Sequence, residues 1–155
     1  MIRKARVADV KKIHLLVNQS AARGEMLARP LGELYDNLRD YFVYIEDENV
    51  IGTGALHLCW EDLAEVRSLC VTDQSRKKGI GRALVEACVE EAKAYDINKL
   101  FLLTYQVEFF KKCGFVETDK KVFPQKIWSE CIKCPKFPEC DETAMIRETG
   151  SEGNG

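Results

Sequence analysis

The sequence predicts one α/β domain in which a mixed β-sheet carries helices on both faces, and three observations predict it. Strand-like and helix-period runs of apolar residues alternate in the order β-α-α-β-β-β-α-β-α-β, with a late strand. Residues 40–72 hold three strand-like runs separated only by turn residues, as expected for an antiparallel meander. Residues 99–104 form a continuous apolar run, as expected for a strand covered on both faces. Such alternation is typical of layered α/β domains.

The first part of the chain is expected to form a strand and then two helices. Residues 2–6 form the expected strand, and Asp9 is a candidate N-cap for the following helix. Apolar residues at helical spacing mark that helix, namely Val10, Ile13, Leu16 and Val17. After a loop that contains Gly, Arg and Pro, a second and shorter helix is marked by Leu31, Leu34, Tyr35 and Leu38.

Residues 41–46, 50–60 and 63–72 are the three strands of the predicted meander. Asp47, Glu48 and Asn49 separate the first two strands, which is a connection length typical of a hairpin. Gly52 and Gly54 lie inside the second strand, and glycines there indicate either a β-bulge or the close approach of another backbone.

A long amphipathic helix follows the meander. Its apolar stripe consists of residues at helical spacing, namely Ile80, Leu84, Ala87, Cys88, Ala92 and Tyr95. After the strand at 99–104, a short helix is expected at 107–112, and Gly114 stands where a helix end often needs a left-handed residue.

The remaining elements complete one domain over residues 1–148. A strand is expected to begin at Phe115, a helix to lie within 123–133, and the last strand to span 142–148. Residues 149–155 are rich in Gly, Ser and Asn, so we expect a flexible C-terminal tail.

Composition excludes several classes of function. A net charge of −2 gives the chain no electrostatic bias toward nucleic acid or an anionic membrane. No apolar run approaches the roughly 18 residues of a membrane span, and the N-terminus lacks a secretion signal, so a cytoplasmic protein with small-molecule partners is expected. Seven cysteines are an odd number for a secreted disulfide framework. A homodimer is left open.

The stretch from Arg67 to Ala94 carries a candidate anion site. Between a strand and the long helix, two glycines and a cluster of cations occur together, in the order Arg76, Lys77, Lys78, Gly79, Ile80, Gly81 and Arg82. Glycines let a backbone approach a ligand closely, and the first turn of a helix offers unpaired N–H groups. A pyrophosphate is the anion that this arrangement fits best. The alternative is a helix start with solvated Lys and Arg side chains.

Two common phosphate-binding loops do not fit this sequence. A Walker loop requires Gly-x-x-x-x-Gly-Lys-Ser/Thr, and a dinucleotide loop requires a third Gly or Ala where Leu84 stands. The remaining pattern, Arg-x-x-Gly-x-Gly before an amphipathic helix, resembles the acetyl-CoA loop of the GNAT superfamily of N-acetyltransferases. The order of elements resembles the GNAT fold over residues 2–148.

The resemblance to GNAT proteins implies where acetyl-CoA binds. Its pantetheine arm would run beside the strand at Leu69, Cys70 and Val71, with backbone groups of Cys70 and Val71 supporting the thioester. Its pyrophosphate would bind the loop of residues 76–82.

Glu65, at the start of the same strand, resembles the glutamate that many GNAT enzymes use as a general base. Arg67 lies two residues on and therefore on the same face of the strand. The alternative for Glu65 is an exposed carboxylate at a strand end. Many family members carry a Tyr four residues before a Gly-Phe pair as general acid, but this chain has Phe110 there, so Tyr105 is the nearest alternative.

A narrower resemblance to short amino-acid N-acetyltransferases related to N-acetylglutamate synthase occurs at residues 26–35, 64–69, 103–105, 109–110 and 124–128. It implies acetylation of L-glutamate, the first step of arginine synthesis. Three cations could bind the two carboxylates, namely Arg29, Arg67 and Lys126. Alternatives are another amine (glutamine, another amino acid, a polyamine or a protein N-terminus) and a non-catalytic acyl-CoA sensor. Arg29 could equally be a solvated loop residue.

The segment 131–140 contains Cys131, Cys134 and Cys140. A Cys-x-x-Cys pair with a third thiolate could form part of a structural zinc site. Cys113, His57 or Asp141 could supply a fourth ligand. The alternative is a loop whose thiols bind nothing.

Overall fold

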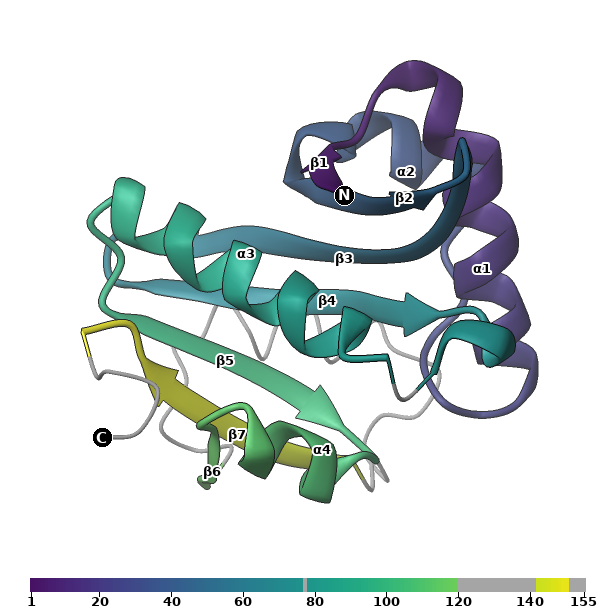
Figure 1. The fold of residues 1–155 in the computed structure, drawn as a ribbon. Helices are drawn as coiled ribbons and strands as arrows, with labels where there is room; N and C mark the ends of the chain where they lie inside the picture. The colour runs from purple at the N-terminus through teal and green to yellow at the C-terminus, as the bar shows by residue number, and fades with distance from the viewer. Residues whose placement is uncertain (77, 120–141, 151–155) are drawn as a thin grey trace.

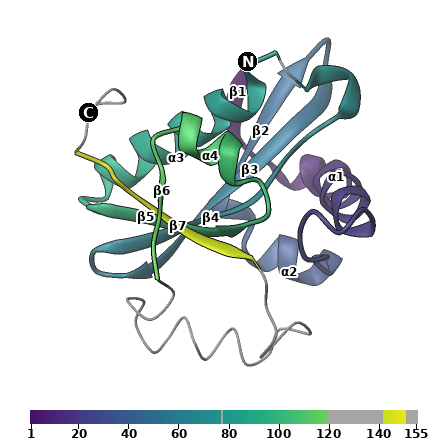
Figure 2. The ribbon, with the colours of Figure 1, turned by 90° about the horizontal axis from the view of Figure 1, so that it is seen from below.

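The computed structural model describes residues 1–76, 78–119 and 142–150 (Figure 1). Its described strands form a seven-stranded sheet in the order β1-β2-β3-β4-β5-β7-β6. Helices α3 and α4 cover one face, and α1 and α2 lie on the other, as Figure 2 shows. Within the described part of the chain, no helix is long and apolar enough to cross a membrane.

The bounds of the elements follow the predicted order. The strands are β1 (Ile2–Lys4), β2 (Tyr41–Glu46), β3 (Asn49–Trp60), β4 (Leu63–Val71), β5 (Lys99–Thr104), β6 (Val116–Glu117) and β7 (Thr143–Glu148). The α-helices are α1 (Val10–Ala22), α2 (Leu31–Asp36), α3 (Ile80–Ala94) and α4 (Val107–Lys112). Short 3-10 turns are η1 (Val7–Asp9), η2 (Leu38–Asp40) and η3 (Asp73–Ser75). The candidate helix at 123–133 lies outside the described residues.

Strands β2, β3 and β4 form the predicted antiparallel meander. The β2–β3 turn is a two-residue loop, because Glu46 pairs with Asn49 across it. Its residues Asp47 and Glu48 have φ angles of 51° and 66°. Left-handed conformations at both positions match the twist of the flanking strands, which explains why so short a loop can close this hairpin.

A bulge interrupts β4 where it pairs with β3. Thr53 pairs with Cys70 and Ala55 with Arg67, so two steps along β3 match three steps along β4. Ser68 lies in this bulge with a φ of 55°. Gly52 of β3 allows α3 to approach the sheet closely, because a Cβ at this position would lie 3.2 Å from Ile80 Cγ2 of that helix.

The core has two main layers, one on each face of the sheet. The larger lies under α3 and α4 and includes the fully buried Leu84, Val85, Cys88 and Leu100. The other lies under α1 and α2 and is formed largely by Val10, Ile13, Val17, Leu34 and Val43. The apolar stripes predicted for α1 and α3 therefore face the sheet, as helical spacing requires, except that Tyr95 follows the end of α3 and is exposed.

A buried cation joins α3, α4 and β7. Arg147 Nη1 donates to the carbonyl oxygen of Cys113 at 2.6 Å and to Glu86 Oε1 at 2.8 Å. Gly114 ends α4 with a φ of 91°, as predicted, and a Cβ there would lie 3.3 Å from Arg147 Nε. A side chain at this position would therefore crowd the arginine as well as strain the backbone.

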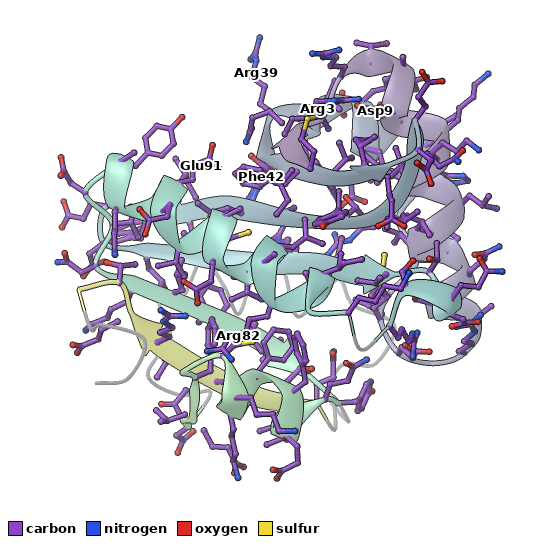
Figure 3. All side chains as sticks on the ribbon, viewed as in Figure 1. Arg3, Asp9, Arg39, Phe42, Arg82 and Glu91 are labelled. Atoms are coloured by element: carbon purple, nitrogen blue, oxygen red, sulfur yellow. The ribbon has the colours of Figure 1, made fainter. Side chains whose placement is uncertain are left out.

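The structure corrects three details of the predicted elements. Strand β1 ends at Lys4 rather than at residue 6. Asp9 does not cap α1 with its side chain; its Oδ2 accepts hydrogen bonds from Arg6 N and Arg3 Nη1 instead, both at 2.7 Å, which ties β1 to η1 (Figure 3). Thr149 is buried and its Oγ1 donates to the carbonyl of Ile97 at 2.7 Å, so the ordered chain extends beyond residue 148.

Candidate active site

The candidate site lies where β4 and β5 part. These parallel strands pair over three positions, Leu63 with Lys99, Ala64 with Leu100 and Glu65 with Phe101. Beyond Glu65, β4 continues to Val71 and β5 to Thr104, and the two described strands no longer pair with each other. The end of β4 that leads into α3 therefore lies beyond its pairing with β5.

Both glycines of the predicted anion loop are explained by backbone geometry. Gly79 precedes α3 with a φ of 78°, a left-handed conformation that most residues avoid. Gly81 lies in the first turn, where a Cβ would stand 3.0 Å from Phe109 Cζ of α4. The loop therefore leads directly into the N-terminus of α3, where Gly79 and Gly81 flank the unpaired N–H groups of the first turn.

The cations of this loop are paired with protein carboxylates. Arg76 Nη2 lies 3.0 Å from Glu25 Oε2, and Arg76 Nε lies 3.4 Å from Asp73 Oδ1. Arg23 donates to both oxygens of Asp73 at 2.7 Å, which lowers the pKa of Asp73 and raises that of Arg23. These pairs tie the segment after α1 to the segment before α3.

The remaining loop cations have different surroundings. Lys78 is exposed, with its Nζ 4.0 Å from Glu46 Oε1. Arg82 extends toward α4 in Figure 3, and its charge opposes the rise in the Cys113 pKa that burial causes. Lys77 lies outside the described residues. Of the predicted phosphate contacts, Arg76 and Lys78 therefore lie in the loop before α3, whereas Arg82 lies on the side of α3 that faces α4.

The end of β4 presents side chains to both layers of the core. Leu69 and Val71 pack on the α3 side, whereas Cys70 packs among the residues under α1. Burial raises the pKa of the Cys70 thiol to about 12, and a hydrogen bond with Ser20 opposes that rise. A thiol held neutral in this way is a poor nucleophile, so Cys70 can serve a ligand only through its backbone.

A pocket of about 300 Å³ opens beside the end of β4. It is lined by residues of α1, the segment after it and the β4–η3 junction, namely Leu16, Gln19, Ser20, Arg23, Val71, Thr72, Asp73 and Gln74. Both members of the Arg23–Asp73 pair belong to its lining, so the pocket lies beside the predicted anion loop.

Glu65 and Arg67 form an ion pair through Oε1 and Nε. Both side chains are largely buried, with exposed fractions of 15% for Glu65 and 13% for Arg67. They lie on the face of the sheet covered by α1 and α2, because Arg67 pairs with Ala55 of that layer. The predicted base and clamp are therefore neighbours, and each contacts the other.

Arg29 approaches the same face from the α1–α2 loop. Its Nη1 lies 2.6 Å from Glu33 Oε1, and its backbone N donates to Asn18 Oδ1 at 3.3 Å. Lys126 and the three cysteines at 131, 134 and 140 lie outside the described residues, so their predicted roles stay predictions. The described residues hold no group of three or more His, Cys, Asp or Glu that could bind a metal ion.

Phe110 and Tyr105, the two positions considered for the general acid, differ in exposure. Phe110 is buried, with its ring 5.7 Å from that of Phe115 in an edge-to-face contact. Tyr105 follows β5 and is 37% exposed. A hydroxyl near the thiolate could thus come from Tyr105, whereas the Phe110 ring belongs to the core.

Sequence reasoning missed a polar pair between the two arginines. Tyr41 Oη and Ser68 Oγ share a hydrogen bond of 3.1 Å. The pKa of Tyr41 is raised mainly by burial, and the charges of Arg29 and Arg67 both act on it. Tyr41 begins an ordinary strand pattern and Ser68 occupies an unpredicted bulge, so nothing in the local sequence marks them.

A second missed pair is His57 with Asp40. His57 Nδ1 lies 2.7 Å from Asp40 Oδ2, and both side chains are about three-quarters buried, with exposed fractions of 23% and 25%. Seventeen residues separate them in the chain, so only the pairing of β2 with β3 could have predicted the contact.

Comparison with known sequences identifies relatives of this arrangement. The sequence profile of the Acetyltransferase (GNAT) family matches residues 9–115. An uncharacterized N-acetyltransferase of Chlorobaculum tepidum is 41% identical over 146 residues, which is 94% of each chain. An amino-acid acetyltransferase of Mycobacterium tuberculosis is 32% identical over 136 residues, which is 86% of this chain and 78% of that protein.

Solved structures show the same fold. Rv2747 from Mycobacterium tuberculosis, in complex with CoA and NLQ, has a TM-score of 0.83 and 26% identity, over 96% of this chain and 98% of that chain. The N-acetylglutamate synthase of Neisseria gonorrhoeae, complexed with coenzyme A and N-acetyl-glutamate, has a TM-score of 0.88 over 97% of this chain and 35% of that chain. At 22% identity this second likeness shows the fold alone. The predicted fold and enzyme class are confirmed.

Proposed function

The chain belongs to the GNAT family of acetyltransferases, and from this premise we propose that it transfers the acetyl group of acetyl-CoA to the α-amine of L-glutamate. The observation that carries the choice of acceptor is the pair of arginines, Arg29 and Arg67, which lie on the α1–α2 face near Tyr41, each beside a carboxylate of the chain. Two guanidinium groups around one polar centre suit an acceptor with two carboxylates. The product would be N-acetylglutamate, which begins arginine synthesis.

Acetyl-CoA is proposed to bind along the unpaired side of β4 and the start of α3. The pyrophosphate would contact Arg76, Lys78 and the first-turn N–H groups after Gly79, with Lys77 as a further predicted contact. The likeness to Rv2747, whose structure contains CoA, supports this placement. Main-chain N–H groups at Cys70 and Val71 would then support the charge that develops on the thioester oxygen.

The acceptor is proposed to bind on the α1–α2 face, between Arg29 and Arg67. The amino-acid acetyltransferase from Mycobacterium tuberculosis supports an amino acid as the acceptor class. Glu65, whose carboxylate contacts Arg67, is proposed to contact the ammonium group and to help remove its proton. A substrate carboxylate that binds Arg67 would share or replace this contact and free Glu65 for the amine.

A specific observation also favours glutamine as a second candidate acceptor. Arg29 already has a carboxylate partner in Glu33, at 2.6 Å. If that pair persists when an acceptor binds, one arginine remains for the α-carboxylate, and an uncharged side chain would be accepted. The Rv2747 structure, which holds CoA together with NLQ, is compatible with either acceptor.

The test is release of CoA from acetyl-CoA by the purified protein across glutamate, glutamine, the other amino acids and a polyamine. We expect saturable turnover with glutamate well above the others. Turnover with glutamine alone would replace the acceptor, and tight acetyl-CoA binding with no turnover on any amine would refute the proposal in favour of an acyl-CoA sensor.

A matched pair of variants tests the arginine clamp. Arg29→Gln should raise the KM for glutamate by about 10- to 100-fold, because a charge-assisted hydrogen bond contributes roughly 1.5–3 kcal/mol. Arg39→Gln is the control, since Arg39 lies in η2 and points away from the fold in Figure 3. Equal KM values for the two variants would remove Arg29 from the site.

A further inference from the structure

His57 and Asp40 form a dyad on the same face as the proposed acceptor site. His57 pairs with Glu65 across β3 and β4, so their side chains lie side by side on one face of the sheet. Asp40 of η2 contacts the imidazole ring of His57, with 2.7 Å between His57 Nδ1 and Asp40 Oδ2. The dyad therefore lies one strand away from the residue proposed to contact the amine.

The contact with Asp40 fixes the tautomer of the imidazole. A carboxylate oxygen can only accept a hydrogen bond, so the ring proton must be on Nδ1 when the ring is neutral. Nε2 then carries the lone pair and can accept a proton. An imidazole oriented by a carboxylate, with its second nitrogen available as acceptor, is the arrangement that general bases use.

Glu65 Oε1 is engaged by the Arg67 guanidinium, and the side chain of Glu65 lies beside that of His57. The imidazole is therefore the neighbouring group that can accept the proton of the amine. We propose that His57, oriented by Asp40, is the residue that receives the proton leaving the acceptor amine, with Glu65 as the group that contacts the ammonium. This inference rests on the proposed function, since it needs an amine acceptor.

The acceptor ammonium loses one proton, which reaches His57 Nε2 through Glu65 or a water molecule, and the imidazolium is stabilised by Asp40. The free amine attacks the thioester carbon, the C–S bond breaks, and CoA leaves as a thiolate. The second amine proton neutralises that thiolate, and His57 returns its own proton to solvent, so each cycle releases one proton.

The charged groups around the dyad come from η2 and β4. Asp40 of η2 contacts His57, Glu65 of β4 pairs with His57 across the two strands, and Glu65 in turn contacts Arg67. The chain contains only two histidines, His14 and His57. His14 lies on α1 in a half-buried position and provides a natural control for any effect of an imidazole.

The experiment measures kcat against pH at saturating acetyl-CoA and acceptor, using the amine that the wild-type protein acetylates fastest. His57→Gln should lower kcat by about 100-fold or more, as loss of a general base typically does, and should remove the acid limb of the profile. Asp40→Asn should act in the same sense with a smaller loss. His14→Gln and Asp36→Asn should match the wild type.

Two further readouts separate chemistry from structure. Thermal midpoint and acetyl-CoA affinity should be unchanged in His57→Gln, and added imidazole should restore part of the turnover of His57→Ala. If wild type acetylates an amine but His57→Gln keeps the turnover and pH profile of His14→Gln, the role of His57 is refuted and the proposed function stands. If wild type acetylates no amine, both fail.

Discussion

Replacing Glu25 by Gln should tighten acetyl-CoA binding, although the change removes an ion pair from the protein. Glu25 Oε2 lies 3.0 Å from Arg76 Nη2, within the segment that follows α1. A pyrophosphate that binds Arg76 must compete with this carboxylate. Gln keeps the size of the side chain and removes the charge, so the competition weakens while the local packing is retained.

The size of the effect follows from the exposure of the pair. The Arg76 side chain is 42% exposed and that of Glu25 is 22% exposed, so water screens the interaction. Pairs of this kind contribute about 0.2–1 kcal/mol, which corresponds to an affinity gain of about 1.4- to 5-fold. Asp73 Oδ1, which lies 3.4 Å from Arg76 Nε, is unaffected by the substitution and would still compete, so we expect a gain in the lower part of this range.

The assay is calorimetric titration of CoA into wild type and variant at low and high salt. The control is Glu46→Gln, which removes an equal charge near the loop but contacts Lys78 at 4.0 Å rather than Arg76. We expect Glu25→Gln to exceed Glu46→Gln at low salt and the difference to vanish at high salt. Weaker binding by Glu25→Gln would mean that Glu25 positions Arg76 instead of competing for it.

Three other changes test the fold and the predicted metal. Gly81→Ala should cost up to about 2 kcal/mol and weaken acetyl-CoA binding, because the new Cβ would meet Phe109 at 3.0 Å, as melting and titration will show. Arg147→Met should lower the free energy of unfolding by about 1–3 kcal/mol, because it leaves the buried carbonyl of Cys113 without its hydrogen-bond donor. Glu86→Gln changes a partly exposed partner of the same arginine and should cost under about 1 kcal/mol. Denaturant unfolding measures both. If the cysteine segment binds zinc, elemental analysis should find about one zinc per chain and Cys134→Ser should lower it, while absence of zinc from protein grown with the metal would end that prediction.

The order of elements could be predicted because it depends on periodicity. Apolar spacing located α1 and α3, and the continuous run at 99–104 located the central strand β5, whose two faces are both covered. The glycine before α3 was also predictable, since Gly79 has a φ of 78° and meets a local backbone requirement. Patterns of this kind are written within one short stretch of chain.

Features that depend on two distant stretches could not be predicted in the same way. The bulge at Ser68 exists only relative to β3, and the contact of His57 with Asp40 follows from the register of β2 on β3. Asp9 shows the same limit: its position suggested a cap, but Arg3 on the adjacent strand takes its carboxylate. Sequence spacing specifies which face a side chain occupies, not which charge will meet it there.

The cations predicted to bind ligands illustrate that limit most clearly. Arg29, Arg67 and Arg76 each have a carboxylate of the same chain as a partner, and the pairs are Arg29 with Glu33, Arg67 with Glu65 and Arg76 with Glu25. Binding an anionic substrate at these residues therefore replaces one anionic partner of each arginine with another. Selectivity among acceptors must then come from the distance between the two arginines and from the Tyr41–Ser68 pair between them. A shorter dicarboxylate such as aspartate, which offers the same charges as glutamate at a smaller separation, should for that reason be acetylated poorly.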